Sequence, residues 1–384
     1  MEKEPGVSKR FHLASLTPDD TSICDDADSF LQSGFWGSFK ARFGWEALAF
    51  RTVWESAGEN LIEEKSLLAL RRKLVPGFSL VYIPWGPELP DANLSSSHNL
   101  NFESTAKELA IALKKLLPKE TAFIRFDLPW RIAGVCIATG RNISEADRAK
   151  AMPVPFIRSG ADIQAPDTVV LDLSQPMDSI KAQMKSKWRY NAKLAEKKGV
   201  NISRAGKEKM GVFYELLKET ARRDGISIHS YQYYETLYEN TWYPGRKPDL
   251  RLYLAEHEGD ALAGIMTIFL GKRAVYLYGA SSNKKRNLMA PYGLQLKAME
   301  DAKAFGCTEY DLYGIPPNEN PKHPMAGLYR FKTGFGGIIV HRYGCWDYPC
   351  RPFAYWFFRN AERLRKKILN ARKHLIKAKK QEEI

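Results

Sequence analysis

Lys332 is the residue whose sequence surroundings most clearly favour chemistry. It lies in the run Gly327-Leu-Tyr-Arg-Phe-Lys-Thr-Gly-Phe-Gly-Gly337, between aromatic residues and beside a glycine-rich turn. An ammonium held in a partly dry site strongly favours developing negative charge, so Lys332 is a candidate stabiliser of an oxyanion in acyl transfer. The spacing alone fits a solvated lysine at a strand edge as well, and that interpretation stays open.

Tyrosines accompany this run. Tyr276 and Tyr278 are two residues apart in an apolar segment, so we expect them to share one face of a strand. Further phenols nearby are Tyr310, Tyr313 and Tyr329. We expect most of them to pack in the core, while one hydroxyl could line a channel for the acyl group, and Asp311 has the same two interpretations. No Ser-His-Asp motif is recognisable, so a covalent acyl-enzyme is not expected.

The elements that must position these residues follow a strand-strand-strand-helix-strand order. The expected elements are helices over Pro176–Lys198 and Met210–Asp224, strands over Arg251–Glu256, Ala261–Leu270 and Ala274–Ala280, a helix over Pro291–Ala304 and a strand over Glu309–Gly314. Gly-containing turns separate the three consecutive strands, which predicts that they are antiparallel. This order resembles the core of an N-acetyltransferase-like (GNAT-type) domain.

The first half of the chain repeats the scheme without evident sequence identity. The expected elements are a short helix over Gln32–Phe39, strands over Ala47–Val53, Leu67–Leu74 and Phe78–Ile83, a helix over Phe102–Leu117 and a strand over Thr121–Asp127. Turn formers over Gly160–Asp167 precede a strand at Thr168–Leu173 and mark a domain boundary. We therefore expect an α+β fold with two tandem GNAT-like domains, residues 1–166 and 167–343, followed by a basic helical segment over 344–384.

Composition limits the class of protein and of partner. The 384 residues exceed what one core usually fills, and a net charge of +14 indicates anionic partners: phosphates, nucleic acid or an acidic membrane surface. Neither a signal peptide at Met1–Phe11 nor a bilayer-spanning run is apparent, so we expect a cytoplasmic protein. The cysteines are scattered, without the spacing of a zinc site, so reduced thiols and no metal are expected. They are Cys24, Cys136, Cys307, Cys345 and Cys350.

Coenzyme A is disfavoured as the acyl donor. Acetyltransferases that use it carry an Arg/Gln-x-x-Gly-x-Gly/Ala loop, whose amides hold the pyrophosphate at the start of the central helix. The corresponding run here, Lys285-Arg-Asn-Leu-Met-Ala-Pro-Tyr-Gly293, lacks that glycine pattern, and Pro291 removes a donor amide. No cofactor is expected.

Four stretches, taken in order along the chain, resemble one known family. Leu31–Lys40 contains Gln-x-x-x-Trp-x-x-x-Lys, Phe123–Asp127 contains Arg-Phe-Asp, Lys185–Val200 is a basic helix, and Tyr276–Tyr292 is followed by Tyr310–Ile315 and Leu328–Lys332. The family is FemABX, aminoacyltransferases that use aminoacyl-tRNA to extend the stem peptide of peptidoglycan precursors. The resemblance implies two GNAT-like domains without a long helical-hairpin arm, and a precursor that is linked to a nucleotide or to a lipid.

The resemblance also implies roles for individual residues. The substrate-binding set is Trp36, Lys40, Asp127, Arg223, Tyr276 and Tyr278, and the set at the transfer centre is Phe331, Lys332 and Asp311. Lys40 and Arg223 would hold the acceptor's diphosphate, because cations donate charge-assisted hydrogen bonds to phosphate. Lys332 would stabilise the oxyanion, and Asp311 or a substrate phosphate would take the proton. Ala122 stands where members often have tyrosine. The first domain would bind the acceptor, the second would carry out transfer, and we expect a monomer.

The C-terminal segment leaves alternatives open. Ten Lys or Arg residues between Arg359 and Lys380 face a single acid, Glu362, and aromatic residues precede them. Residues 353–380 would suit an anionic membrane surface at the inner face of the cell membrane, the tRNA backbone, or packing on the first domain. Two rival functions also remain: an acyltransferase of the same superfamily that acts on another amine, and a non-catalytic nucleic-acid-binding protein.

Overall fold

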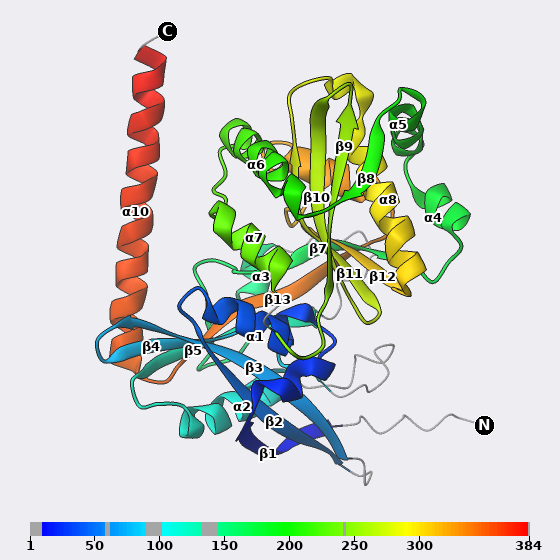
Figure 1. The fold of residues 1–384 in the computed structure, drawn as a ribbon. Helices are drawn as coiled ribbons and strands as arrows, with labels where there is room; N and C mark the ends of the chain where they lie inside the picture. Colours follow the sequence, from blue (N-terminus) through cyan, green and yellow to red (C-terminus); the bar gives the residue numbers. More distant parts are fainter. Residues whose placement is uncertain (1–9, 58–61, 90–101, 133–143, 241–242, 383–384) are drawn as a thin grey trace, which may run out of the picture.

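Two sheets joined into one continuous ladder dominate the computed structural model (Figure 1). The structure describes residues 10–57, 62–89, 102–132, 144–240 and 243–382. The strand order is β1-β2-β3-β4-β5-β13-β7-β12-β11-β10-β9-β8, with β6 on β13. Strands β1 to β6 belong to the first half of the chain and β7 to β12 to the second.

The first half has the expected strand and helix order. Its elements are β1 (Arg10–Asp19), α1 (Gly34–Ala41), β2 (Glu46–Ala57), β3 (Ile62–Val75), β4 (Phe78–Ile83), α2 (Phe102–Leu116), β5 (Thr121–Arg131), α3 (Glu145–Arg148) and β6 (Ile157–Arg158). Strands β2, β3 and β4 are antiparallel neighbours, and β4 pairs with β5 in parallel after the crossover through α2. Strand β1, which the sequence did not predict, adds an antiparallel edge.

The second half repeats this topology. Its elements are β7 (Asp167–Asp172), α4 (Met177–Gln183), α5 (Ser186–Lys197), β8 (Asn201–Ala205), α6 (Met210–Asp224), α7 (Tyr231–Glu239), β9 (Asp249–His257), β10 (Asp260–Leu270), β11 (Arg273–Ser281), α8 (Ala290–Phe305), β12 (Glu309–Gly314) and α9 (Ala326–Thr333). Strands β9 to β11 are antiparallel, and β11 pairs with β12 in parallel across α8. The fold of two tandem GNAT-like units is thereby confirmed, and the described residues contain no helical-hairpin arm.

Strand β13 (Ile338–Pro349) belongs to both sheets. Residues Ile338–His341 pair with β7, and from Arg342 onward the strand pairs with β5. The register shifts between Arg342 and Gly344, and Gly344 has a φ of +71°, a conformation that glycine adopts without strain. Residues 344–349, which the sequence assigned to the C-terminal helix, are therefore strand, and α10 (Pro352–Glu382) begins three residues later. The division into domains at 166 and 343 stays a prediction.

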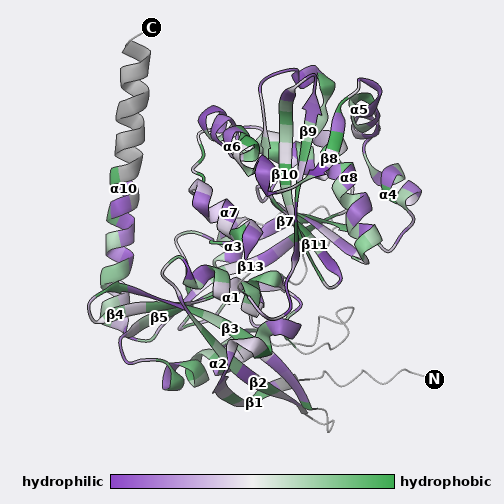
Figure 2. Ribbon diagram, in the orientation of Figure 1, coloured by the Kyte–Doolittle hydropathy of each residue, from purple (hydrophilic) through white to green (hydrophobic). Residues whose placement is uncertain are grey.

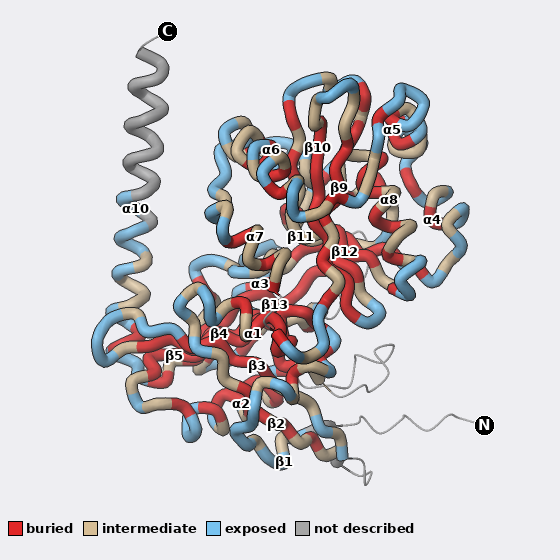
Figure 3. The backbone as a smooth tube through the Cα atoms, viewed as in Figure 1, coloured by how far each residue is buried: buried red, intermediate tan, exposed pale blue. Residues whose placement is uncertain are grey.

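One hydrophobic core connects the two halves. Phe35 and Phe39 of α1 share a buried cluster with Phe213 of α6 and Tyr233 of α7, and the rings of Phe39 and Tyr233 lie 4.9 Å apart. Two further clusters fill the outer faces, one beneath α2 and one beneath α8. Figure 1 shows α6 and α7 on one side of the second sheet and α5 and α8 on the other. Figure 2 and Figure 3 show hydrophobic, buried strands in both sheets. Each fully buried large side chain contributes about 1.5–3 kcal/mol to stability, so burial stabilises the contact between the two halves as it does a protein interior.

Among the described side chains, those in the first turns of helix α10 contact the first sheet. The ring of Phe123 on β5 lies 5.2 Å from Tyr355 and 4.7 Å from Phe358. Arg125 forms a buried two-pronged pair with Asp347 of β13, at 2.7 and 2.9 Å, and the Tyr355 hydroxyl donates to the same carboxylate at 3.0 Å. The arginine of the Arg-Phe-Asp strand therefore anchors the helix, while Asp127 points elsewhere.

Replacing Arg125 with Ala is expected to destabilise the protein by about 3–5 kcal/mol, because Asp347 stays buried without its counter-charge. Arg51→Ala is the matched control: Arg51 is 42% exposed, pairs with Asp19 and Glu64, and should cost no more than about 1 kcal/mol. Urea denaturation measures both. Equal, small effects would show that the Arg125 pair does not hold this junction.

Candidate active site

Lys332 lies in helix α9 and its side chain is buried, with 5% of the residue exposed. The ammonium donates a hydrogen bond to the carbonyl of Gly314 at 2.9 Å and lies 5.1 Å from the centre of the Tyr276 ring. The interpretation of a solvated lysine at a strand edge is therefore wrong. The sequence analysis assigned no helix to this run, and the glycine-rich turn that it expected beside Lys332 follows the end of α9, from Gly334.

The end of a parallel pairing creates the position that Lys332 occupies. Strands β11 and β12 pair only over Arg273–Val275 and Glu309–Asp311. The residues beyond this pairing, Tyr276 on β11 and Gly314 on β12, both contact the Lys332 ammonium. The site is therefore built where the two strands cease to pair.

The charge of Lys332 is finely balanced. Burial lowers the pKa of its ammonium to about 7, and the negative charge of Asp311 opposes that shift. Removal of a cation from water penalises its charged form, so a lysine without a directly bonded carboxylate responds in this way. Near neutral pH both the ammonium and the amine are populated, which suits a group that donates a proton or hydrogen bond during reaction.

Asp311 is buried and accepts hydrogen bonds on both oxygens. One oxygen accepts from the hydroxyl of Thr168 and, at 2.7 Å, from the backbone N–H of Tyr313. The other accepts from Arg342 at 3.1 Å. A carboxylate held by these donors is well suited to fixing its neighbours in place, and its lone pairs are largely used.

Tyr276 and Tyr278 lie on opposite faces of the sheet. Tyr276 pairs with Thr267 and Tyr278 with the preceding residue, Met266, so Leu277 is an extra residue in β11. Tyr276 packs with the core beneath α8, whereas Tyr278 packs with the core between the halves. The expectation that they share one face is wrong, because a β-bulge inserts one residue and reverses the alternation.

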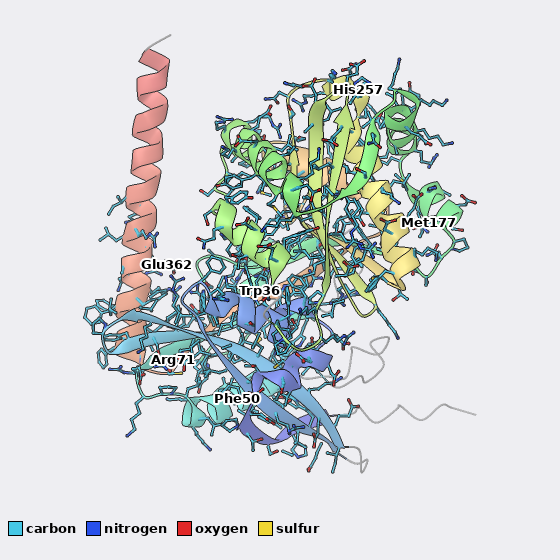
Figure 4. All side chains as sticks on the ribbon, viewed as in Figure 1. Trp36, Phe50, Arg71, Met177, His257 and Glu362 are labelled. Carbon is cyan, nitrogen blue, oxygen red and sulfur yellow. The ribbon has the colours of Figure 1, made fainter. Side chains whose placement is uncertain are left out.

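Lys40, at the end of α1, lies among aromatic rings at the junction of the halves. Its ammonium is 5.6 Å from the ring centre of Trp36, 5.8 Å from Trp45 and 5.5 Å from Tyr233. Figure 4 labels Trp36 at this junction, between the first sheet and the helices of the second half. Burial, and secondarily the charge of Arg72, lower the pKa of Lys40 to about 8. Among the described residues, no carboxylate is found among the charges that act on this ammonium.

Asp127 and Tyr278 face the same junction. The carboxylate of Asp127 accepts from the Tyr82 hydroxyl at 3.0 Å and from the backbone N–H of Gln164 at 2.9 Å. Burial raises the pKa of Asp127 to about 6, against these two hydrogen bonds. Burial and the neighbouring Tyr233 raise the pKa of the Tyr278 hydroxyl. Tyr233 contacts both Tyr278 and Lys40, so these three side chains adjoin one another.

Two of the predicted site residues have contacts elsewhere. The Phe331 ring lies 5.3 Å from Tyr292 and 5.1 Å from Phe335, and its carbonyl accepts from Trp188 at 2.8 Å. It therefore packs α9 against α5 and α8. Arg223, in the last turn of α6, donates to the backbone carbonyl of Ser281 at 2.7 Å, at the end of β11.

The junction also contains residues that sequence reasoning did not select: Trp45, Tyr82, Gln164, Tyr233 and Arg342. The tyrosine-rich run of α7, Tyr231-Gln-Tyr-Tyr234, was a usable signal for Tyr233. Gln164 lies in a turn-forming segment and Arg342 in an unpredicted strand, and neither carries a motif.

Other kinds of site find little support in the described part of the chain. It contains no cluster of His, Cys, Asp or Glu that could hold a metal ion, and the described cysteines are buried free thiols. Cys136 lies outside the described residues. A groove of about 850 Å³ lies between α4, α5 and α8, and none of the predicted site residues lines it. Across the described ranges, no helix is both long and apolar enough to span a membrane.

Comparison with known proteins agrees with this architecture. The model of the FemAB family matches residues 22–257 and 246–363. The chain belongs to the FemAB family. The crystal structure of FemX is similar over 90% of this chain and 100% of that one, with a TM-score of 0.70 at 19% identity, which shows a shared fold.

Curated relatives of this FemAB chain include two lipid II:glycine glycyltransferases. The protein of Staphylococcus epidermidis is 25% identical over 244 residues, 48% of this chain and 59% of the relative. That of Staphylococcus saprophyticus is 26% identical over 230 residues, 45% of this chain and 55% of the relative. This chain thus spans somewhat more than half the length of the curated relatives that it matches.

Replacing Lys332 with Met is expected to stabilise the fold at neutral pH. Because the folded-state pKa of about 7 lies below the ordinary 10.5, the unfolded chain binds more protons, and the lysine lowers the free energy of unfolding as the pH falls from 10.5 to 7. The gain from Met should grow over this range, level off below it and reach on the order of a few kcal/mol. Urea denaturation at several pH values measures the gain.

Lys209→Met is the control for that experiment, since the exposed Lys209 ammonium pairs with Glu256 at 2.9 Å. Its effect on stability should be small and without this pH dependence. A Lys332→Met protein that is less stable than the parent at pH 7 would contradict the burial of an unpaired ammonium.

Proposed function

We propose that this protein transfers an amino acid from aminoacyl-tRNA to an amine of the stem peptide of a peptidoglycan precursor, forming an interpeptide bridge. The observation that carries the proposal is the buried Lys332 ammonium, held by the Gly314 carbonyl beside Tyr276 in a chain of the FemAB family. The curated relatives named for glycine transfer to lipid II support an acceptor of this class.

The junction between the halves supports recognition of the acceptor. Lys40 is held by rings, so its donors remain available to the oxygens of a diphosphate. Asp127 and Tyr278 line the same junction and would contact the peptide part, while Arg223 would reach the diphosphate from the end of α6. This arrangement supports an acceptor site in which Lys40 is the phosphate-binding cation and Asp127 supplies a carboxylate.

The second half supports a donor other than coenzyme A. Helix α8 begins at Ala290 with Pro291 in its first turn, so one amide that could hold a pyrophosphate is missing. Exposed lysines surround α5, namely Lys185, Lys187, Lys193, Lys197 and Lys198. A row of exposed cations suits the phosphate backbone of a tRNA, which binds largely through such charges.

The chemistry is aminolysis of an ester. The acceptor amine forms a bond to the carbonyl carbon of the aminoacyl ester, and the carbon–oxygen bond to the tRNA 3′ end breaks. The proton that the amine loses balances the one that the leaving 3′ oxygen gains. Lys332 would donate a hydrogen bond to the oxyanion, where a fixed donor in a dry site acts most strongly. Asp311, whose oxygens are already hydrogen-bonded, would keep the surrounding strand in place and supply a fixed negative charge near Lys332.

Lys332→Met should lower turnover about 10²- to 10³-fold, because one preorganised donor to the oxyanion is lost. The measurement is precursor-dependent release of deacylated tRNA from a mixture of aminoacyl-tRNAs, with binding of the precursor followed separately. Lys209→Met should leave both unchanged. Release by the parent chain that does not depend on Lys332 would remove this residue from the mechanism. No release with any aminoacyl-tRNA would favour an acyltransferase for another amine or a nucleic-acid-binding protein.

Helix α10 supports contact with an anionic membrane surface, where a lipid-linked precursor would lie. Figure 1 shows it extending beyond the end of the sheet formed by β4 and β5. Phe353, Phe357 and Leu364 are 85%, 65% and 59% exposed, and their spacing places them on one face of the helix, opposite the anchored Tyr355. By the same spacing, Arg363 and Lys367 lie beside that face. An aromatic face flanked by cations suits a headgroup layer better than an RNA backbone.

Changing both Phe353 and Phe357 to Ser should weaken binding to phosphatidylglycerol-containing vesicles by roughly 100-fold, from the loss of about 3 kcal/mol of apolar burial. Binding should also fall as salt rises. Ile62→Ser with Val75→Ser, at exposed positions of β3, is the matched control. Unchanged vesicle binding with weaker tRNA binding would assign the helix to the donor, and a shift to dimers in the parent chain would assign the face to a second copy.

A further inference from the structure

The carbonyl that holds Lys332 belongs to a bulge in β12. Asp311 pairs with Val170 of β7, and the next paired residue, Gly314, faces Thr168, so β12 has one residue more than its partner over this stretch. Tyr313 has a φ of +60°, which is unusual for a bulky side chain and persists only where the surroundings impose it. The bulge turns the strand immediately before Gly314, so it determines where this carbonyl points.

Asp311 braces the bulge from within the sheet. Its carboxylate accepts from the backbone N–H of Tyr313, inside the bulge, and from Thr168 on the neighbouring strand. Arg342 donates a hydrogen bond of 3.1 Å to the second oxygen of this carboxylate. Arg342 lies where β13 stops pairing with β7 and leaves the second sheet. The Arg342 guanidinium also lies 4.5 Å from the ring centre of Trp85, a residue of the first half.

A second brace comes from the segment between the halves. The Tyr313 hydroxyl donates a hydrogen bond to the side-chain oxygen of Gln164. The backbone N–H of Gln164 in turn donates to Asp127 at 2.9 Å. The next residue, Ala165, approaches so closely that a Cβ added to Gly314 would lie 2.6 Å from its Cβ. Both ends of the bulge are therefore fixed by residues outside β12.

Arg342 has a feature that packing alone does not account for. One of its terminal nitrogens, Nη1, is buried and has no hydrogen-bond partner among the residues that the structure describes. Unpaired buried donors are costly and rare, so a guanidinium is seldom retained at such a position for stability alone. The other contacts of the guanidinium are with Asp311 and Trp85, and both of these residues contact Tyr313 in the bulge. The Trp85 ring lies 5.7 Å from the Tyr313 ring.

We propose that Arg342 and Gln164 are positioning residues for the transfer reaction: acting through Asp311 and Tyr313, they fix the β12 bulge whose Gly314 carbonyl orients the Lys332 ammonium. The proposal rests on the function proposed above for Lys332. Because Gln164 also holds Asp127, the acceptor side and the transfer side of the site share one scaffold. Neither Arg342 nor Gln164 touches the reacting atoms.

The first test is steady-state kinetics of Arg342→Lys and Tyr313→Phe. Both should lower kcat about 10- to 100-fold, as misplacement of a catalytic group by about 1 Å does, with little change in KM for the acceptor. Arg71→Lys is the matched control: Arg71 is buried in the first sheet and pairs with Glu46 at 2.8 Å, and its partners among the described residues all lie in the first half of the chain. It should lower stability and leave kcat within a factor of two. Equal losses of kcat in all three variants would overturn the proposal.

A double-mutant cycle separates positioning of Lys332 from a general structural effect. In a Lys332→Met background, Arg342→Lys should cause almost no further loss of kcat, because the group that it positions is gone. The same fold loss with and without Lys332 would overturn the proposal. If Arg342→Lys does not fold, Tyr313→Phe, which removes only a hydroxyl, replaces it in the cycle.

A readout without substrate distinguishes failure of this proposal from failure of the proposed function. The ammonium of Lys332 faces the Tyr276 ring from β11 and the Asp311 carboxylate from β12, with Arg342 of β13 behind Asp311. Because the charge of Asp311 raises the pKa of Lys332, Asp311→Asn should move its titration to lower pH. NMR of lysine labelled at Cε, with the signal assigned by Lys332→Met, measures this.

In the same titration, Arg342→Lys and Tyr313→Phe should change the Lys332 midpoint, and Arg71→Lys should not. An unchanged Lys332 titration in Asp311→Asn, Arg342→Lys and Tyr313→Phe would overturn the positioning role even in an active enzyme. A shifted titration in a protein without transfer activity would retain the positioning network and reject the proposed function.

Discussion

The burial of one ammonium sets the demands on the rest of this structure. The Lys332 side chain is almost fully removed from water. In place of water, its ammonium has the Gly314 carbonyl, the Tyr276 ring and the charge of the nearby Asp311 carboxylate. These contacts compensate only in part, which is why burial moves the pKa of the lysine to about 7. A buried cation of this kind can stabilise negative charge that develops during a reaction. Its surroundings must be rigid so that the ammonium stays aligned with the position of that charge.

Strand β13 supplies much of that rigidity. Since the strand pairs with β7 over one half and with β5 over the other, the two sheets have a fixed relation, and the core between α1 and α7 closes their junction. Lys40, Asp127 and Tyr278 then line one side of the junction, and Lys332 lies where β11 and β12 cease to pair. A duplicated fold thus gives two different surroundings for a cation: aromatic rings around Lys40 and a buried position in α9 for Lys332.

Local sequence patterns predicted the elements well and the site only in part. Helix α6 and strand β4 begin and end at the predicted residues, because amphipathic periodicity and turn formers are local signals. The structure brings Lys40 close to Trp36, and Lys332 close to Tyr276 and Asp311, and the roles that the family resemblance implies for them stay predictions. The opposite faces of Tyr276 and Tyr278 could not be predicted, since the bulge at Leu277 depends on pairing with β10. Gln164 acts through Tyr313, and Arg342 through Asp311 and Trp85, and no local pattern reports these distant partners.

The central claim is that this chain adds an amino acid to a peptidoglycan stem peptide through Lys332. Mass spectrometry of muropeptides tests it most directly, comparing cells that contain the parent chain, cells that lack it and cells that contain only the Lys332→Met chain. The account predicts that stem peptides extended by one or more amino acids disappear in the last two and that unextended peptides replace them. Identical muropeptides in all three would contradict it.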